Sequence, residues 1–171
     1  QDRSSAASDV YKRQAINCIV LISFSSATFT DELKDIIDSK KSSFEEIALD
    51  IWNYAELGYL ETKSSNLLAS ELEENGFIIQ KGVAGIPTSF IAEFNNGGPV
   101  IGILGEFDAL PGLAQTNSPF KEVADNETGA GHACGHHLFG AASAWAAVVI
   151  KEWIEENLSL IHISEPTRPL D

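Results

Sequence analysis

The spacing of apolar residues predicts a helix near the start of residues 30–157. From Phe44 to Ala55, apolar side chains recur every three or four positions while acidic side chains fill the opposite face, as in an amphipathic helix. A capping box at Ser43 suggests that the helix begins there, although apolar residues further upstream, such as Leu33, also allow an earlier start.

Turn-forming residues divide the next stretch into a second helix and a short strand. Gly58 is suited to end the first helix. A second helix is predicted to begin at Thr62 and to end at the Asn-Gly pair of residues 75–76. The apolar residues 77–79 that follow predict a short strand.

Two further strands and a last helix are expected after these elements. Residues 90–94 alternate between apolar and polar, whereas residues 100–104 are almost all apolar. The Asn and Gly residues at 95–98 predict a hairpin, and the apolar run predicts that its second strand is central in a sheet. A helical pattern of small and apolar residues then begins at Leu138 and includes Ala142. This order of elements predicts an α/β fold.

Composition limits the class of protein. The chain has 171 residues, of which 44% are hydrophobic and 21% charged, as in an ordinary globular domain. Its net charge of −14 argues against binding to nucleic acid, which requires basic patches. The two cysteines give no disulfide framework.

The glycine-rich turn of residues 129–138 concentrates metal-binding side chains. It contains His132, Cys134, His136 and His137 directly before the last predicted helix. Zinc prefers thiolate sulfur and imidazole nitrogen, and imidazole also binds other divalent transition metals. A single buried Cys or His is usually a packing residue, but this concentration favours a metal site.

Two carboxylates follow the predicted central strand. Glu106 and Asp108 lie just beyond residues 100–104, and ligands of α/β sheets gather at the carboxyl ends of strands. Alone, this stretch would be interpreted as a solvated loop. With the Cys/His turn downstream, we expect both acids to support the metal ligands.

Both ends of the chain are excluded from the predicted domain. Residues 1–14 and 158–171 resemble translated sequencing-adapter sequence, so His162 is not a candidate ligand. The chain also contains no methionine, and we expect it to be part of a longer reading frame.

Residues 15–28 have the pattern of a signal peptide. They form an apolar run, too short to span a membrane as a helix, that ends in small residues suited to cleavage. This predicts an exported protein without a stable membrane span. The alternative is a buried strand or helix of a cytoplasmic protein.

Two motifs in this order resemble the M20 family of metallopeptidases and amidohydrolases. They are GEFDALPGL at residues 105–113 and GHACGHHLFGAASAWAA at residues 131–147, and shorter similarities occur at residues 52–59 and 85–88. The subgroup most resembled contains p-aminobenzoyl-glutamate hydrolases and the amidohydrolases of amino-acid conjugates. The resemblance covers residues 30–157.

The resemblance implies a role for each matching residue. Cys134 and His136 match the metal ligands of the subgroup. Asp108 matches an acidic residue that supports a metal-binding side chain.

Three other residues are expected around the ligands. Glu106 stands where distant members carry a ligating histidine, and its role stays open. His132 matches no ligand. His137 is a departure, because relatives usually carry Asp or Asn there, which affects the hydrogen bonds expected around the site.

The resemblance also implies the rest of the protein. Residues 30–157 would be the N-terminal part of a three-layer catalytic domain of the metallo-aminopeptidase and carboxypeptidase type, with a central mixed sheet flanked by helices. The intact protein would be a homodimer that binds two divalent ions, Zn or Mn, and hydrolyses N-acyl amino acids or dipeptides. Its general-base glutamate would lie downstream, so this piece by itself would be inactive.

Two other classes of function remain open from the sequence. One is a regulatory protein with a non-catalytic metal site, which His137 permits. The other is a thiol redox protein that uses Cys134, although no Cys-x-x-Cys motif supports it.

Overall fold

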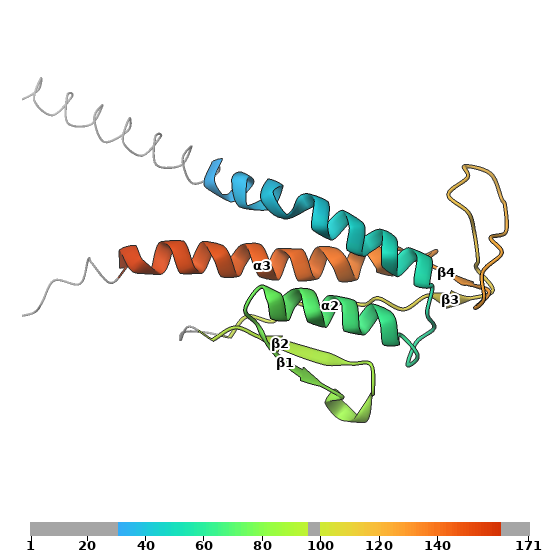
Figure 1. Ribbon diagram of the computed structural model, residues 1–171, viewed down its shortest axis with the longest axis horizontal. Helices are drawn as coiled ribbons and strands as arrows, with labels where there is room; N and C mark the ends of the chain where they lie inside the picture. The colour runs from blue at the N-terminus through green and yellow to red at the C-terminus, as the bar shows by residue number, and fades with distance from the viewer. Residues whose placement is uncertain (1–30, 96–99, 162–171) are drawn as a thin grey trace, which may run out of the picture. The chain divides into compact units, whose positions relative to one another are not determined.

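The computed structural model describes residues 31–95 and 100–161, with only the backbone described for residues 158–161 (Figure 1). The chain divides into two compact units, Gln1–Ser39 and Lys40–Asp171. The elements of the second unit that follow its first helical segment are α2 (Thr62–Glu74), β1 (Ile78–Lys81), the 3₁₀ turn η1 (Val83–Gly85), β2 (Phe90–Glu93), β3 (Leu110–Pro111), β4 (Ala130–Gly131) and α3 (His136–Ile161).

Several sequence predictions concern residues outside this description. The segment 1–14 and the signal-peptide segment 15–28 lie outside the described residues. Of the segment 158–171, the described part is the end of α3, which continues to Ile161. In the part of the chain that is described, no helix is long and apolar enough to cross a membrane.

The first predicted helix is present and starts earlier than Ser43. Residues 31–39 of the first unit are helical, and in the second unit residues 40–54 are helical as well. The capping-box start is therefore wrong, because helix-compatible residues precede Ser43. Instead of capping a helix end, the Ser43 hydroxyl donates a hydrogen bond to Glu71 Oε1 at 3.4 Å.

The second helix, α2, confirms its predicted start and end. At its start, the Glu56 carboxylate accepts hydrogen bonds from the main-chain N–H groups of Lys63 and Ser64 at 2.9 and 2.8 Å. This satisfies donors that a helix leaves unpaired in its first turn. At its end, Gly76 has a φ of 86°, a left-handed conformation that glycine adopts without strain.

The predicted hairpin between residues 90–94 and 100–104 is wrong. β2 pairs instead with β1, antiparallel, through a turn closed by the hydrogen bond from Gly82 N to Ser89 O at 2.8 Å. Residues 100–104 form no strand, and Val100 is 99% exposed. An apolar run requires partner strands on both sides to become a central strand, and among the described residues none lies beside it.

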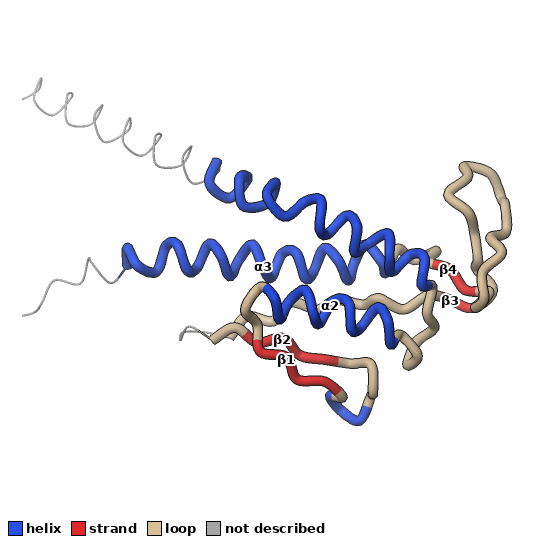
Figure 2. The backbone as a smooth tube through the Cα atoms, in the orientation of Figure 1, coloured by secondary structure: helices blue, strands red, loops and turns tan. Residues whose placement is uncertain are grey.

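The core of the second unit joins its helices to the β1–β2 sheet. α2 contacts α3 and both strands of this sheet, and Figure 2 shows it between them. The ring of Phe44 stacks on that of Trp145 at 5.9 Å. The buried core residues are Phe44, Ile47, Ala48, Ile51, Leu68, Leu72, Phe77, Ala141, Ala144 and Val148.

The buried face of α3 differs slightly from the predicted one. Ala141, Ala144 and Val148 follow helical spacing and are buried, but Leu138 is 59% exposed and Ala142 is also exposed. The neighbouring helices cover only one stripe of α3, so its other apolar positions face outwards. Helices and sheets together confirm the α/β class.

We expect Ile51→Ala to lower the free energy of unfolding by about 2–5 kcal/mol, because the side chain is fully buried and its loss leaves a cavity. Leu49→Ala is the matched control, since Leu49 is 63% exposed and its loss should cost less than about 0.5 kcal/mol. Urea unfolding followed by circular dichroism measures both. Equal losses would contradict this core.

Candidate metal site

The segment of residues 104–109 is held at both ends by other elements. The Ser143 hydroxyl of α3 donates a hydrogen bond to Leu104 O at 2.8 Å. At the other end, Ala109 N donates to Glu56 O at 2.7 Å, and Ala109 forms a parallel bridge with Leu57. These contacts fix Glu106 and Asp108 beside α3 without a continuous sheet ladder.

Two glycines allow this segment to approach α3 closely. A Cβ atom at Gly140 would lie 3.0 Å from Glu106 O and 3.0 Å from Phe107 Cβ. A Cβ atom at Gly105 would lie 3.1 Å from Ser143 Cβ. Both distances are shorter than ordinary carbon contacts, so a larger residue at either position would move the segment away from the helix.

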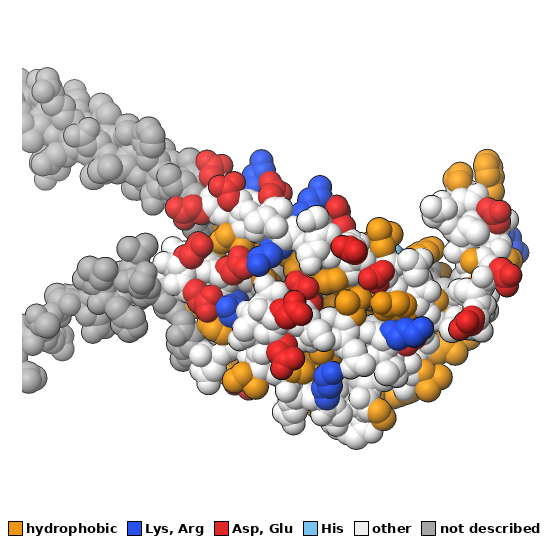
Figure 3. All heavy atoms as spheres, in the orientation of Figure 1, with side chains coloured by type: hydrophobic (Ala, Val, Ile, Leu, Met, Phe, Trp, Pro, Cys, Tyr) orange, Lys and Arg blue, Asp and Glu red, His pale blue; other side chains and the backbone are white. Residues whose placement is uncertain are grey.

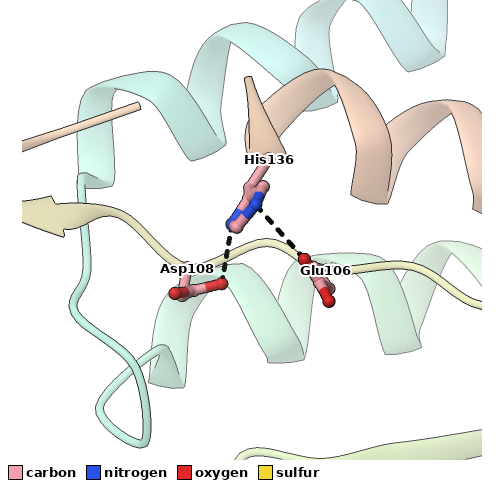
Figure 4. A group of neighbouring side chains, drawn as sticks. All are labelled: Glu106, Asp108 and His136. Atoms are coloured by element: carbon pink, nitrogen blue, oxygen red, sulfur yellow. Dashed lines mark hydrogen bonds and ion pairs between the residues drawn. The ribbon is translucent and has the colours of Figure 1, made fainter. Parts of the chain in front are cut away.

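A tight turn brings His136 to the start of α3. The side-chain amide of Asn126 donates to Ala130 O at 2.9 Å, and its carbonyl accepts from Gly129 N at 2.8 Å. Gly135 then has a φ of 78°, which favours glycine, and its carbonyl begins the hydrogen bonding of α3. The imidazole therefore leaves the first turn of the helix on the side that the acidic segment approaches (Figure 4).

The imidazole of His136 lies between two carboxylates. Its Nδ1 is 2.9 Å from Asp108 Oδ1, and its Nε2 is 3.2 Å from Glu106 Oε2 (Figure 4). One ligand atom from each of the three residues lies within 4.8 Å of the others. We call Glu106, Asp108 and His136 the acidic triad.

The chemistry of the acidic triad suits a divalent metal ion. When a histidine binds a metal, its second ring nitrogen usually donates a hydrogen bond to a carboxylate or carbonyl, which fixes the tautomer and the orientation of the ring. Asp108 can accept this bond from Nδ1, leaving the lone pair of Nε2 directed towards Glu106. Imidazole nitrogen and carboxylate oxygen are both zinc ligands.

Cys134, which the sequence predicts as a ligand, is not a member of the acidic triad. It is a free, exposed cysteine in the turn before α3. Its predicted partner, His136, is a member, and so is Glu106, for which the sequence assigned no definite role. Asp108 lies where a supporting carboxylate is expected, against the ring nitrogen that faces away from Glu106.

His132 and His137 lie in an aromatic cluster with Trp52. The ring of His137 meets Trp52 edge to face at 4.9 Å, and the two histidine rings are 5.1 Å apart. His132 is buried and bonds through Nε2 to the carbonyl of Ile51 at 3.0 Å. Burial lowers the pKa of His132, and burial together with His132 lowers the pKa of His137, so both rings favour the neutral form.

Two contributors to the site could not be recognised in the sequence. Gly140 is one of several small residues in the pattern of the last helix, although its lack of a side chain allows residues 106–107 to approach α3. Trp52 fitted the apolar face of the first helix, although it is only partly buried and contacts both histidines. Both residues lie in stretches that carry the family resemblance, residues 52–59 and 131–147, but nothing in those stretches indicates the contacts that they make.

We expect Gly140→Ala to weaken zinc binding by about tenfold or more, because the new methyl group displaces Glu106 and Asp108 from His136. A loss of this size is typical when a group that orients a metal ligand is removed. The helix itself should not suffer, since alanine is the better helix former by about 1 kcal/mol. Competition with a chromophoric chelator measures the affinity. Ala142→Ser, on the exposed side of α3, is the control, and equal zinc affinities of the two variants would contradict the role of Gly140.

Comparison with curated proteins finds several relatives of this chain. It is 40% identical over 124 residues to a subunit of p-aminobenzoyl-glutamate hydrolase of Escherichia coli, and the match covers 72% of this chain and 26% of that protein. It is 34% identical over 105 residues to N-acetylcysteine deacetylase of Bacillus subtilis, covering 60% and 27%. It is 31% identical over 104 residues to hippurate hydrolase of Campylobacter jejuni, covering 61% and 26%.

These relatives extend far beyond the matched region. The chain spans about a quarter of the length of the curated relatives that it matches, and no protein-family model matches it. The similarity nevertheless covers most of the chain and recurs in hydrolases and a deacetylase from different bacteria. With both motifs in the expected order, it shows that the chain belongs to the M20 family of metallopeptidases and amidohydrolases.

Proposed function

We propose that this chain supplies part of the metal site of a hydrolase that cleaves the amide bond of N-acyl or N-aroyl amino acids, such as p-aminobenzoyl-glutamate, or of dipeptides. The observation that carries the proposal is the position of His136 between two carboxylates in the acidic triad. The names of the relatives, which are hydrolases or deacetylases of such compounds, support this substrate class.

Residues of this chain would hold the ion as follows. His136 would bind through Nε2 and Glu106 through Oε2, whose separation of 3.2 Å suits two ligands of one ion with bonds of about 2.0–2.2 Å. Asp108 would accept a hydrogen bond from Nδ1–H and so orient the ring. Cys134, exposed directly before Gly135, would add a thiolate after a local rearrangement of that turn.

The metal would be divalent, with zinc and manganese as the candidates, and the intact protein would bind two ions. When bound, such ions lower the pKa of a water molecule and polarise the scissile carbonyl. A glutamate beyond residue 157 would carry the proton to the leaving amine, as general acid–base catalysis requires. We therefore propose that residues 30–157 bind metal but do not hydrolyse amides.

We also propose that the intact protein is a homodimer and that residues 15–28 direct its export to the periplasm or the medium. A second candidate function is a regulatory protein that binds metal without catalysis. The position of His137 favours this second candidate, because its ring packs on Trp52 where the family resemblance leads us to expect a hydrogen-bonding Asp or Asn.

We expect Asp108→Asn to weaken zinc binding by the chain about 10- to 100-fold, because the amide holds the His136 ring less firmly and carries no negative charge. His136→Ala should remove binding above the background of the chain surface. Isothermal titration with zinc chloride measures both. Glu73→Gln is a matched control, since Glu73 is an exposed carboxylate on α2, and a loss there as large as at Asp108 would contradict the assigned site.

In the intact protein, we expect Cys134→Ala and His136→Ala each to abolish metal retention and the hydrolysis of p-aminobenzoyl-glutamate. The loss of a ligand leaves fewer than the roughly three protein ligands of a catalytic zinc site. Metal analysis and a panel of N-acyl amino acids measure the two effects. An intact protein that retains metal but hydrolyses no member of the panel would favour the regulatory candidate.

A further inference from the structure

A cavity lies beside the glycine-rich turn of residues 129–138, under the loop that joins β3 to β4. Its volume is about 320 Å³, and both Trp52 of the first helix and His132 of the turn line it. Figure 3 shows the surface hollowed next to this loop, which stands out from the rest of the second unit. A cavity of about 150 Å³ is already large enough to hold benzene, so an aromatic ring has ample room here.

The walls of the cavity suit an aromatic group. Trp52 provides a large aromatic surface, and Leu113 and Val123 add apolar side chains from the loop. Val123 is 74% exposed and Leu113 44%, so both still have apolar surface that a ligand could cover. Burying that surface against a ring is favourable, and aromatic pairs gain further from edge-to-face or offset contact.

A lysine also lines the cavity. Lys121 has no ion-pair partner among the described residues, whereas its neighbour Glu122 accepts a hydrogen bond from the Thr116 hydroxyl at 2.9 Å. The Glu122 carboxylate is therefore already hydrogen-bonded within the loop. The ammonium group of Lys121 remains available to an anion in a chain whose net charge is −14.

The cavity is lined in part by the turn that precedes His136. His132 and Ala133 line the cavity and lie a few residues before His136 in that turn. Trp52 likewise contacts His137, the residue after His136. A ligand in the cavity would therefore contact the same turn that carries His136 into α3.

We propose that this cavity binds the N-aroyl amino acid, with its aromatic ring against Trp52 and its carboxylate at Lys121. The proposal rests on the substrate class proposed above and assigns residues of this chain to its recognition. It also predicts a preference for aromatic over small aliphatic acyl groups, because an acetyl group cannot cover Trp52, Leu113 and Val123 together.

Ligand binding to the full chain tests this without catalysis. Benzoylglycine, acetylglycine and benzamide are titrated in the presence of EDTA and followed by saturation-transfer NMR. Acetylglycine, which lacks the ring, should bind about tenfold or more weakly than benzoylglycine. Benzamide, which lacks the carboxylate, should bind several-fold more weakly than benzoylglycine.

Variants then assign the two contacts. Lys121→Ala should weaken benzoylglycine binding several-fold and leave benzamide binding unchanged, whereas Lys41→Ala, which removes an exposed lysine outside the cavity, should change neither. Val123→Asp should weaken the binding of both aromatic compounds. We choose Val123 for this test because a substitution of Trp52 would disturb the packing of His132 and His137. Circular dichroism checks that each variant is folded.

The results separate this inference from the proposed function. Equal binding of benzoylglycine and acetylglycine, or unchanged benzoylglycine binding by Lys121→Ala, would overturn the cavity assignment even if the intact protein hydrolyses amides. The expected binding pattern together with an intact protein that hydrolyses no N-acyl amino acid would instead count against the proposed function alone.

Discussion

The candidate site depends on the close approach of residues 104–109 to the first turns of α3. Among the described parts of the chain, this segment pairs with other strands only through the bridge between Leu57 and Ala109. Its position is therefore set by the hydrogen bond from the Ser143 hydroxyl, by the hydrogen bond of Ala109 N and by the absence of a side chain at Gly140. Steric exclusion is short in range and steep, so one methyl group is enough to shift such a contact. Small residues on α3 therefore determine whether Glu106 and Asp108 reach His136.

Electrostatics explains why this approach suits a metal ion. Two carboxylates that flank one imidazole, in a chain of net charge −14, create a concentration of negative charge that repels itself. A divalent cation would relieve this repulsion and use the same oxygen and nitrogen atoms as ligands. Because Glu106 is about half exposed, an ion could reach the acidic triad from solvent.

Trp52 connects the parts of the molecule that the proposals use. It belongs to the helical segment of residues 40–54, its ring meets both histidines of the turn, and it lines the cavity under the loop. A histidine at position 137 packs well against such a ring, whereas the Asp or Asn expected from the resemblance would not. The histidine that departs from the family pattern at position 137 therefore packs against an aromatic side chain.

Local sequence signals were enough to predict the helices and to select candidate residues for the site. Helical spacing, turn residues and Gly76 specified α2 and α3, and motif spacing singled out Asp108 and His136, because these signals depend on neighbours within a few positions. Three other features became apparent only in the folded chain: β2 pairs with β1, residues 100–104 form no strand, and Glu106 rather than Cys134 lies at the imidazole. Strand pairing and side-chain convergence depend on which distant segments meet, and an apolar run or a cysteine carries no information about its partner.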